Sequence, residues 1–286
     1  MLDIIVFNVS HGQSIFVYPQ THPDYGMLID CGNTEDFNPV DFLLQHALIR
    51  GDGYGLPTLS NLTLTNYDHD HFSGLPYLMG KVFVKTITFP QNLSSQDLRS
   101  MKPEQTVALD KICYLKDTYT VPATLHRPPY QVVAFSLTRD CFPGGLCDTN
   151  NLSQVVFVAY GGSVICISGD VEEHAWAQLL TRPDFQAWLK ATKVFVAAHH
   201  GRESGYAEEV FSHCSPEVIV LSDKPVVHGT QEGMSQTYAN HVAGNGVRLL
   251  QPPTLTPRKV LTTRNDGHIW VQFDLMGGRQ YRTFVV

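Results

Sequence analysis

Short apolar runs alternate with helical patterns along most of the chain, as is typical of an α/β fold. Strands are expected in these runs: 2–9, 14–18, 26–32, 61–65, 81–89, 154–159, 163–167, 193–198 and 217–222. Apolar residues three or four positions apart predict these helices: 40–50, 105–115, 172–180 and 233–245. The chain closes with short strands expected at 247–250, 259–263, 268–274 and 280–285.

The region around 90–150 interrupts this alternation. Polar and proline-containing stretches there surround one helical pattern, at 105–115, and one strand-like run, at 130–137. The 286 residues, 43% of them hydrophobic, suit one large domain with an ample core. We therefore expect a single domain over 1–286 with an insertion or cap at roughly 90–148, where specificity is usually acquired.

The strand expected at 61–65 leads directly into a polar cluster that contains Asn66, Asp68, Asp70 and His71. The carboxyl ends of strands are where open α/β sheets place their ligands. Carboxylates and imidazoles packed this closely would repel, or cost heavily in desolvation, without a cation between them. Alternate residues from Asn66 to Asp70 can converge on one point while His71 reaches a second. The cluster predicts a metal site, and its alternative is a solvated turn before a helix.

Other candidate site residues also follow predicted strands. Asp30 ends the third strand and could orient a ligand histidine, or cap the next turn. Asp170 follows the strand 163–167 and could instead cap a helix. His199 and His200 follow the strand 193–198, and His228 lies just beyond 217–222 as a phosphate-binding group, a proton donor or an ordinary loop histidine. We expect these strand ends to meet at one edge of the fold.

The charge of the chain bears on which kinds of molecule the protein can bind. The formal net charge is −7, and no run of Lys or Arg supplies the basic face that non-specific binding of long nucleic acid usually needs. The first residues lack the basic region of a signal peptide, and no stretch approaches the roughly 20 apolar residues that span a bilayer. A cytoplasmic protein without a membrane partner is expected.

Taken together, these motifs resemble those of the metallo-β-lactamase superfamily, and more closely the metallo-β-lactamase domain of ComEC-type bacterial DNA-uptake proteins. The resemblance covers nearly the whole chain except roughly 90–145. It rests on these segments: 7–14, 28–32, 66–74, 151–153, 167–170, 198–201 and 263–267. It implies an α/β fold, a four-layer αββα sandwich, with a metal site along the shared sheet edge. It also implies hydrolytic activity, often on phosphodiesters.

The chain departs from the family pattern in one half of the expected site. The central motif of the superfamily is His-x-His-x-Asp-His, and the ComEC branch tends to have His-x-Asp-x-Asp-His, whereas this chain has Asn66 and Asp68 at the first two ligand positions. The turn that usually ends Gly-Asp is Gly12-Gln13 here. We expect one or two divalent ions. Zn²⁺ and Mn²⁺ are the first candidates and Mg²⁺ is a further one, because the carboxylate and amide oxygens at the first two positions shift the preference from Zn²⁺ toward harder metals.

The resemblance assigns roles to the candidate residues. Asp70 and His71, completed by a histidine of the pair His199-His200, would hold one ion, and Asp170 would bridge to a second. Asn66 and Asp68 would hold that second, looser ion, and Asp70 and His228 are the candidate catalytic residues.

The expected chemistry follows from the Lewis acidity of such ions. A divalent ion lowers the pKa of bound water, which favours hydrolysis of phosphodiesters by a nuclease or a nucleotide phosphodiesterase. A carbon ester, lactone or thioester hydrolase and a non-catalytic interaction module with a degraded metal site are the alternatives.

Overall fold

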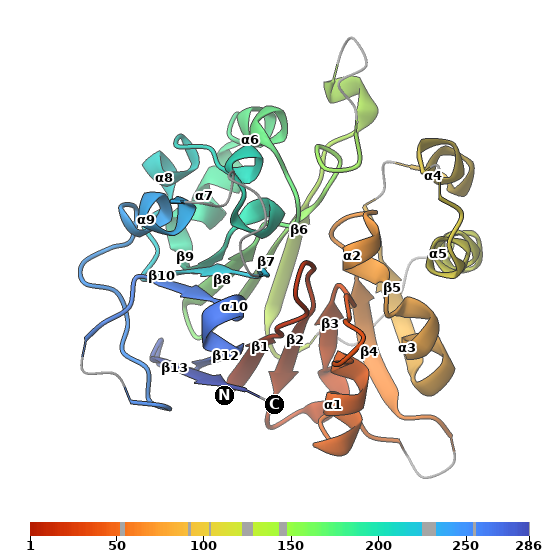
Figure 1. Ribbon diagram of the computed structural model, residues 1–286, viewed down its shortest axis with the longest axis horizontal. Coiled ribbons are helices and arrows are strands. Elements are labelled where there is room, and N and C mark those ends of the chain that lie inside the picture. Colours follow the sequence, from red (N-terminus) through yellow and green to blue (C-terminus); the bar gives the residue numbers. More distant parts are fainter. Residues whose placement is uncertain are drawn as a thin grey trace.

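The computed structural model describes residues 1–51, 55–90, 93–102, 104–121, 128–142, 148–224, 233–253 and 256–285. Two mixed β-sheets face each other, and helices flank the outer side of each sheet (Figure 1). This order of layers, helix, sheet, sheet, helix, is the αββα arrangement expected from the sequence. Its consequence for function is that the ends of strands from both sheets reach one common edge.

The first sheet has seven strands within the described residues, in the order β13 (Arg279–Phe284), β12 (His268–Phe273), β1 (Leu2–Val6), β2 (Ile15–Pro19), β3 (Met27–Ile29), β4 (Thr58–Thr63) and β5 (Phe83–Thr88). Neighbours from β13 to β3 are antiparallel, and β3, β4 and β5 are parallel. Leu2 pairs with Phe273, so the first strand lies beside β12, and the last strand, β13, lies beyond it.

The second sheet has six strands in the described ranges, in the order β11 (Val260–Thr262), β10 (Val218–Leu221), β9 (Thr192–Val196), β8 (Ser163–Ile167), β7 (Val155–Tyr160) and β6 (Gln131–Phe135). The strands from β11 to β8 are parallel, and β7 and β6 continue antiparallel. β6 lies inside the expected insertion, yet Phe135 pairs with Val155, so this strand belongs to the sandwich. The strand expected at 247–250 is absent from the described residues, where Val247 and Leu250 form only isolated bridges.

Helices fall into two groups. Beside the first sheet lie α1 (Pro39–Gln45), α2 (His69–Phe72), α3 (Leu75–Lys81), α4 (Ser95–Met101) and α5 (Val107–Thr118) (Figure 1). The other side has α6 (Glu173–Leu179), α7 (Pro183–Ala191), α8 (Val210–His213) and α9 (Met234–Ala239), and α10 (Thr263–Asp266) links β11 to β12. α5 contacts α2, α3 and α4, so the inserted helices rest on the short helix that follows β4.

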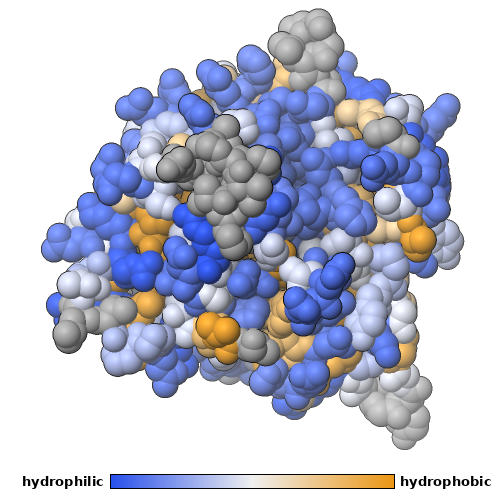
Figure 2. Space-filling view, in the orientation of Figure 1, coloured by the Kyte–Doolittle hydropathy of each residue, from blue (hydrophilic) through white to orange (hydrophobic). Residues whose placement is uncertain are grey.

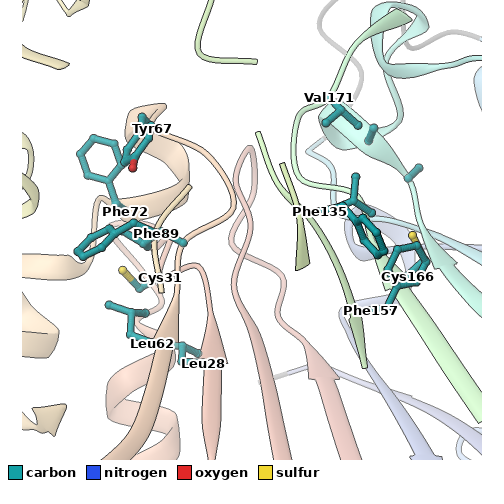
Figure 3. Close-up of a cluster of buried hydrophobic side chains, with 14 of the residues drawn as sticks. Leu28, Cys31, Leu62, Tyr67, Phe72, Phe89, Phe135, Phe157, Cys166 and Val171 are labelled. Carbon is teal, nitrogen blue, oxygen red and sulfur yellow. The ribbon is translucent and has the colours of Figure 1, made fainter. Parts of the chain in front are cut away.

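Alternation of side chains along the strands divides the core into an inner and an outer part. On β1, Ile4 faces the other sheet and packs in the inner cluster with Val194 of β9, while Ile5 faces the helices. Figure 3 shows the outer core on both sides, with Leu62 and Phe72 beside the first sheet and Phe157 beside the second. A side chain as fully buried as Ile4 stabilises the fold by about 1.5–3 kcal/mol. The resulting frame holds the strand ends in place.

None of the helices in the described ranges is long and apolar enough to cross a membrane. The face of the molecule in Figure 2 is mostly hydrophilic, and hydrophobic residues appear on it only in small groups.

Candidate metal centre

Five of the residues singled out from the sequence follow strands and reach the same edge of the two sheets. Asp30 follows β3, and Asp70 and His71 lie in α2, shortly after β4. Asp170 follows β8, and His200 lies in the turn Ala198–Gly201 after β9. Because both sheets direct these strands toward this edge, each sheet contributes side chains to one cluster.

Close backbone packing fixes the position of Asp70. A Cβ atom at Gly12 would lie 2.6 Å from the carbonyl oxygen of Asp70, and one at Gly32 would lie 2.3 Å from it. Both positions therefore require glycine, which lets the turns after β1 and β3 approach the first turn of α2. The amide of Cys31 also donates to the carbonyl of His71 at 2.8 Å, which ties the end of β3 to the same helix.

Four side chains converge, namely Asp70, His71, Asp170 and His200, each with one ligand atom within 4.8 Å of the others. His71 Nε2 lies 3.0 Å from Asp170 Oδ1, and His200 Nε2 lies 3.0 Å from Asp70 Oδ2. His200 Nε2 is also 3.7 Å from Asp170 Oδ1. Two imidazole nitrogens and two carboxylates are a donor set that suits a divalent transition metal.

Asp30 orients the first of these imidazoles. Its carboxylate is wholly buried and accepts hydrogen bonds from the Thr65 amide at 2.7 Å, the Thr65 hydroxyl at 2.5 Å and Gln13 Nε2 at 2.8 Å. His71 Nδ1 lies 2.8 Å from the same carboxylate. Because the carboxylate accepts, the proton of a neutral His71 is on Nδ1, and the lone pair of Nε2 points into the cluster. Gln13, where the family pattern predicts Asp, supports Asp30 through its hydrogen bond.

A backbone carbonyl orients the second imidazole. His200 Nδ1 lies 3.0 Å from the carbonyl oxygen of Ser222, which only accepts hydrogen bonds, so His200 Nε2 is also free to act as a ligand. The turn that carries it is unusual, since His199 and His200 have φ values of 48° and 57°. Non-glycine residues adopt this left-handed conformation rarely and at a cost, and such strain is concentrated at functional sites.

Buried polar atoms that lack hydrogen-bond partners show that these residues fit a metal ion. His71 Nε2, His200 Nε2 and Asp170 Oδ1 are buried and have no hydrogen-bond partner. Burial by itself lowers the pKa of His71, but the charges of Asp170 and Asp30 outweigh it and raise that pKa well above its usual value. Burial opposes the charges of His71 and His200 at Asp170, whose pKa is lowered to about 2. The cluster attracts positive charge, which a divalent ion supplies while replacing protons.

Asp68 lies outside this group of four, and its assignment as a ligand stays a prediction. Its carboxylate accepts hydrogen bonds from the ammonium of Lys102 and from the Thr149 hydroxyl, the latter at 2.6 Å. Asn66 is also engaged, because its Oδ1 accepts from the amides of Tyr67 and Asp68 and its Nδ2 donates to Asn150 Oδ1 at 2.9 Å. Asp68 is therefore paired with an ammonium, and Asn66 is held by hydrogen bonds to the backbone and to Asn150.

His199 lies outside the group as well. Its Nδ1 is 3.0 Å from Glu172 Oε1 and 2.9 Å from the Ser204 hydroxyl, and this pairing with His199 lowers the pKa of Glu172. The structure thus places His200, rather than His199, in the group of four. His228 falls outside the described residues.

Two residues beside the cluster were not singled out from the sequence. His11, on the turn between β1 and β2, has its ring centroid 4.5 Å from that of His200 and its Nε2 3.7 Å from Asp70 Oδ2. Burial, followed by the charge of His200, lowers the pKa of His11 to about 4. Lys102 is the second, and it lies between α4 and α5. His11 stands in a family-like segment, but nothing in the chain around Lys102 marks it.

A pocket of about 300 Å³ opens beside the cluster. Its lining comes from α2 and from the inserted segment with α4 and α5, and consists of Tyr67, Asp68, His69, Asp70, Phe72, Lys102, Glu104, Thr106 and Leu109. Since Asp70 belongs both to this lining and to the four-residue group, a molecule in the pocket would lie next to the metal centre.

Comparison with known protein families agrees with this geometry. A model of the metallo-beta-lactamase superfamily matches residues 8–209, well over half of the chain. The chain belongs to the metallo-beta-lactamase superfamily. By family and by its His/Asp group, the protein is a metallo-hydrolase of that superfamily. The narrower resemblance to ComEC-type domains stays a prediction from the motifs.

Solved structures of this superfamily fold resemble the protein in overall shape. Igni18, a metallo hydrolase from the archaeon Ignicoccus hospitalis, aligns with a TM-score of 0.52 at 11% identity, covering 95% of this chain and 100% of its own. Unliganded yeast PDE1 aligns with a TM-score of 0.50 at 11% identity, covering 84% of this chain and 95% of its own. At such low identity the likeness concerns the fold alone. No curated protein matches the chain.

Proposed function

We propose that the protein hydrolyses phosphodiesters of nucleotide size with a divalent ion held by Asp70, His71, Asp170 and His200. The observation that carries the proposal is the group of buried ligand atoms without hydrogen-bond partners, placed directly beside a pocket that contains an ammonium. When bound, the ion would supply the Lewis acidity that makes water a nucleophile at neutral pH and polarises a phosphoryl oxygen.

The lining of the pocket carries the carboxylates of Asp68, Asp70 and Glu104 and the ammonium of Lys102, so a bound divalent ion together with Lys102 would be needed to attract an anionic substrate. The ammonium of Lys102 lines the pocket, and outside its lining the guanidinium of Arg202 donates to His11 Nε2 at 3.0 Å, which itself lies 3.7 Å from Asp70 Oδ2. Fixed cations stabilise the charge that develops on phosphoryl oxygens, whereas a neutral ester or lactone gains less from them. Glu104 also lines the pocket. Its negative charge suits the single charge of a phosphodiester better than a phosphomonoester with two charges.

Size and net charge favour a nucleotide over a polymer. A pocket of about 300 Å³ lies at the lower end of the range for small-molecule sites, roughly 300–1,000 Å³. The net charge of −7 would repel a polyanion, and binding of long nucleic acid depends on many neutralised phosphates. A nuclease acting on the end of a single strand is the related alternative, since one terminal nucleotide would fit the same pocket.

The test is a substrate screen with metal. Cyclic nucleotides, a generic bis-aryl phosphodiester, single-stranded DNA, duplex DNA and RNA are incubated with the protein in Mn²⁺ and in Zn²⁺, and Asp70→Ala serves as the control for contaminating activity. We expect turnover of nucleotide-sized diesters that the control lacks. Turnover of a lactone or thioester without any diester would support the carbon-ester alternative. Absence of both turnover and bound metal would support the non-catalytic alternative.

A further inference from the structure

We propose that the ammonium of Lys102 replaces the second metal ion. The site would then use two positive charges, namely one bound metal ion and the side chain of Lys102. The first observation is the contact of this ammonium with the carboxylate of Asp68, the acidic residue expected to hold a second ion. Thr149 completes a triad, because its hydroxyl accepts from Lys102 Nζ at 3.0 Å and donates to Asp68.

The remaining groups at this position are not free to bind an ion. Asn66 uses its amide oxygen on two backbone amides and its amide nitrogen on Asn150. Asn150 in turn donates to Glu172 at 3.3 Å, and Glu172 holds His199. A neutral amide that already accepts two hydrogen bonds is a poor ligand, so a second ion would depend on the carboxylates of Asp68 and Asp170 and would bind weakly. The position is filled by a hydrogen-bonded network with one positive charge.

Lys102 is placed to act on a ligand in the pocket. An ammonium has three N–H donors, and within the described part of the chain Lys102 donates to Asp68 and Thr149, which leaves one donor. Its side chain is 22% exposed and lines the same pocket as Asp70. A second ion in a two-metal site holds an oxygen of the reacting group, and the remaining N–H of Lys102 would donate to that oxygen.

Lys102 comes from the inserted segment, whereas the candidate metal ligands come from the two sheets. Lys102 belongs to the segment between α4 and α5, which the insertion adds to the fold, whereas the four metal-binding residues follow strands of the two sheets. Docking of α5 on α2 and α3 holds this segment over the site. The insertion would then supply part of the chemistry as well as the walls of the pocket. This role in the reaction rests on the proposed function, but the exclusion of a second ion does not.

The number of metal ions bound per protein molecule tests whether Lys102 excludes a second ion, and this measurement needs no substrate. Native mass spectrometry and calorimetric titration with Mn²⁺ are carried out on the wild-type protein, on Lys102→Ala and on Lys102→Arg, with circular dichroism to confirm that each is folded. We expect one ion in the wild type and in Lys102→Arg. Lys102→Ala should take up a second, weaker ion at millimolar Mn²⁺, because Asp68 loses its partner and the repelling charge is gone.

Activity on a bis-aryl phosphodiester tests the role in the reaction. Lys102→Ala should lose at least tenfold in kcat at one equivalent of metal and recover part of it in millimolar Mn²⁺, while the wild type gains nothing from the excess. Two ions in the wild type, or a single ion in Lys102→Ala at millimolar Mn²⁺, would overturn the inference while leaving the hydrolase proposal intact. Correct stoichiometries without diester turnover would overturn the proposed function alone, and a wild type that binds no ion would overturn both.

Discussion

Replacement of Asp30 by asparagine should weaken metal binding without removing any ligand atom. In the native site the Asp30 carboxylate accepts from His71 Nδ1, which leaves His71 Nε2 unprotonated for the ion. In Asp30→Asn the new amide has one acceptor oxygen, which the Thr65 amide at 2.7 Å occupies. Its NH₂ group then faces His71 Nδ1 and favours the tautomer with the proton on Nε2, which cannot bind a metal.

The size of this effect follows from the role of Asp30. Loss of a hydrogen-bond partner that orients a metal-binding histidine typically weakens metal affinity 10–100-fold, which corresponds to about 1.4–2.7 kcal/mol. Asp30 has a φ of 56°, a conformation that asparagine also tolerates, so the backbone should not change. Replacement of charge-assisted hydrogen bonds by neutral ones should lower the free energy of unfolding by about 1–3 kcal/mol.

Competition with a chromophoric chelator measures the affinity for Zn²⁺, and urea unfolding of the metal-free protein measures the stability. Asp3→Asn is the matched control. Asp3 is also a buried carboxylate with three side-chain donors, Gln20, Trp270 and Gln272, but it lies at the far end of β1 from the site. It should lose comparable stability and keep its metal affinity within about twofold. Equal affinity in Asp30→Asn and wild type, or equal weakening in both variants, would refute the reasoning.

Further predictions concern the candidate metal-binding residues and one histidine of the core. Asp70→Ala and His71→Ala should each abolish turnover and lower the bound metal in elemental analysis, and near wild-type turnover in either would contradict their assignment. His268 accepts a hydrogen bond from the Asn8 amide at 2.9 Å, and burial lowers its pKa from 6.5 to about 4. The unfolded chain therefore binds the proton more readily between these values, and stability falls as the pH drops through 6.5 toward 4. Urea unfolding should show a loss of roughly 2 kcal/mol from this group between pH 7 and pH 5. This loss should be absent in His268→Gln, and an unchanged slope would show that other groups cause it.

The sequence was sufficient for the residues whose placement depends on one strand end. Asp30, Asp70, His71 and Asp170 lie at the end of a predicted strand or within a few residues after one, so the rule that ligands collect at the carboxyl ends of strands brought them to one edge. The choice between His199 and His200 was beyond that rule, because it depends on two left-handed residues in a turn that no local pattern requires.

Contacts between segments far apart in the sequence could not be predicted either. Lys102 reaches Asp68 only because α5 docks on α2 and α3, and a lysine in a polar segment gives no sign of such a contact. Likewise β6 was assigned to the insertion, since its pairing with β7 depends on a partner strand 20 residues or more further along the chain. Predictions from local pattern succeed where neighbours in sequence decide the structure, and fail where distant segments do.

The origin of the four converging side chains in both sheets has a consequence for the whole molecule. Asp70 and His71 are attached to the first sheet, and Asp170 and His200 to the second, so a bound ion would cross-link the two halves of the sandwich. An ion at 100 times its dissociation constant adds about 2.7 kcal/mol to the stability of the fold. Such coupling is reciprocal, so a cavity between the sheets that lets them shift, such as one left by Ile4→Ala, would also loosen the ion. The packing between the sheets and the affinity for the ion at their shared edge would then be thermodynamically coupled.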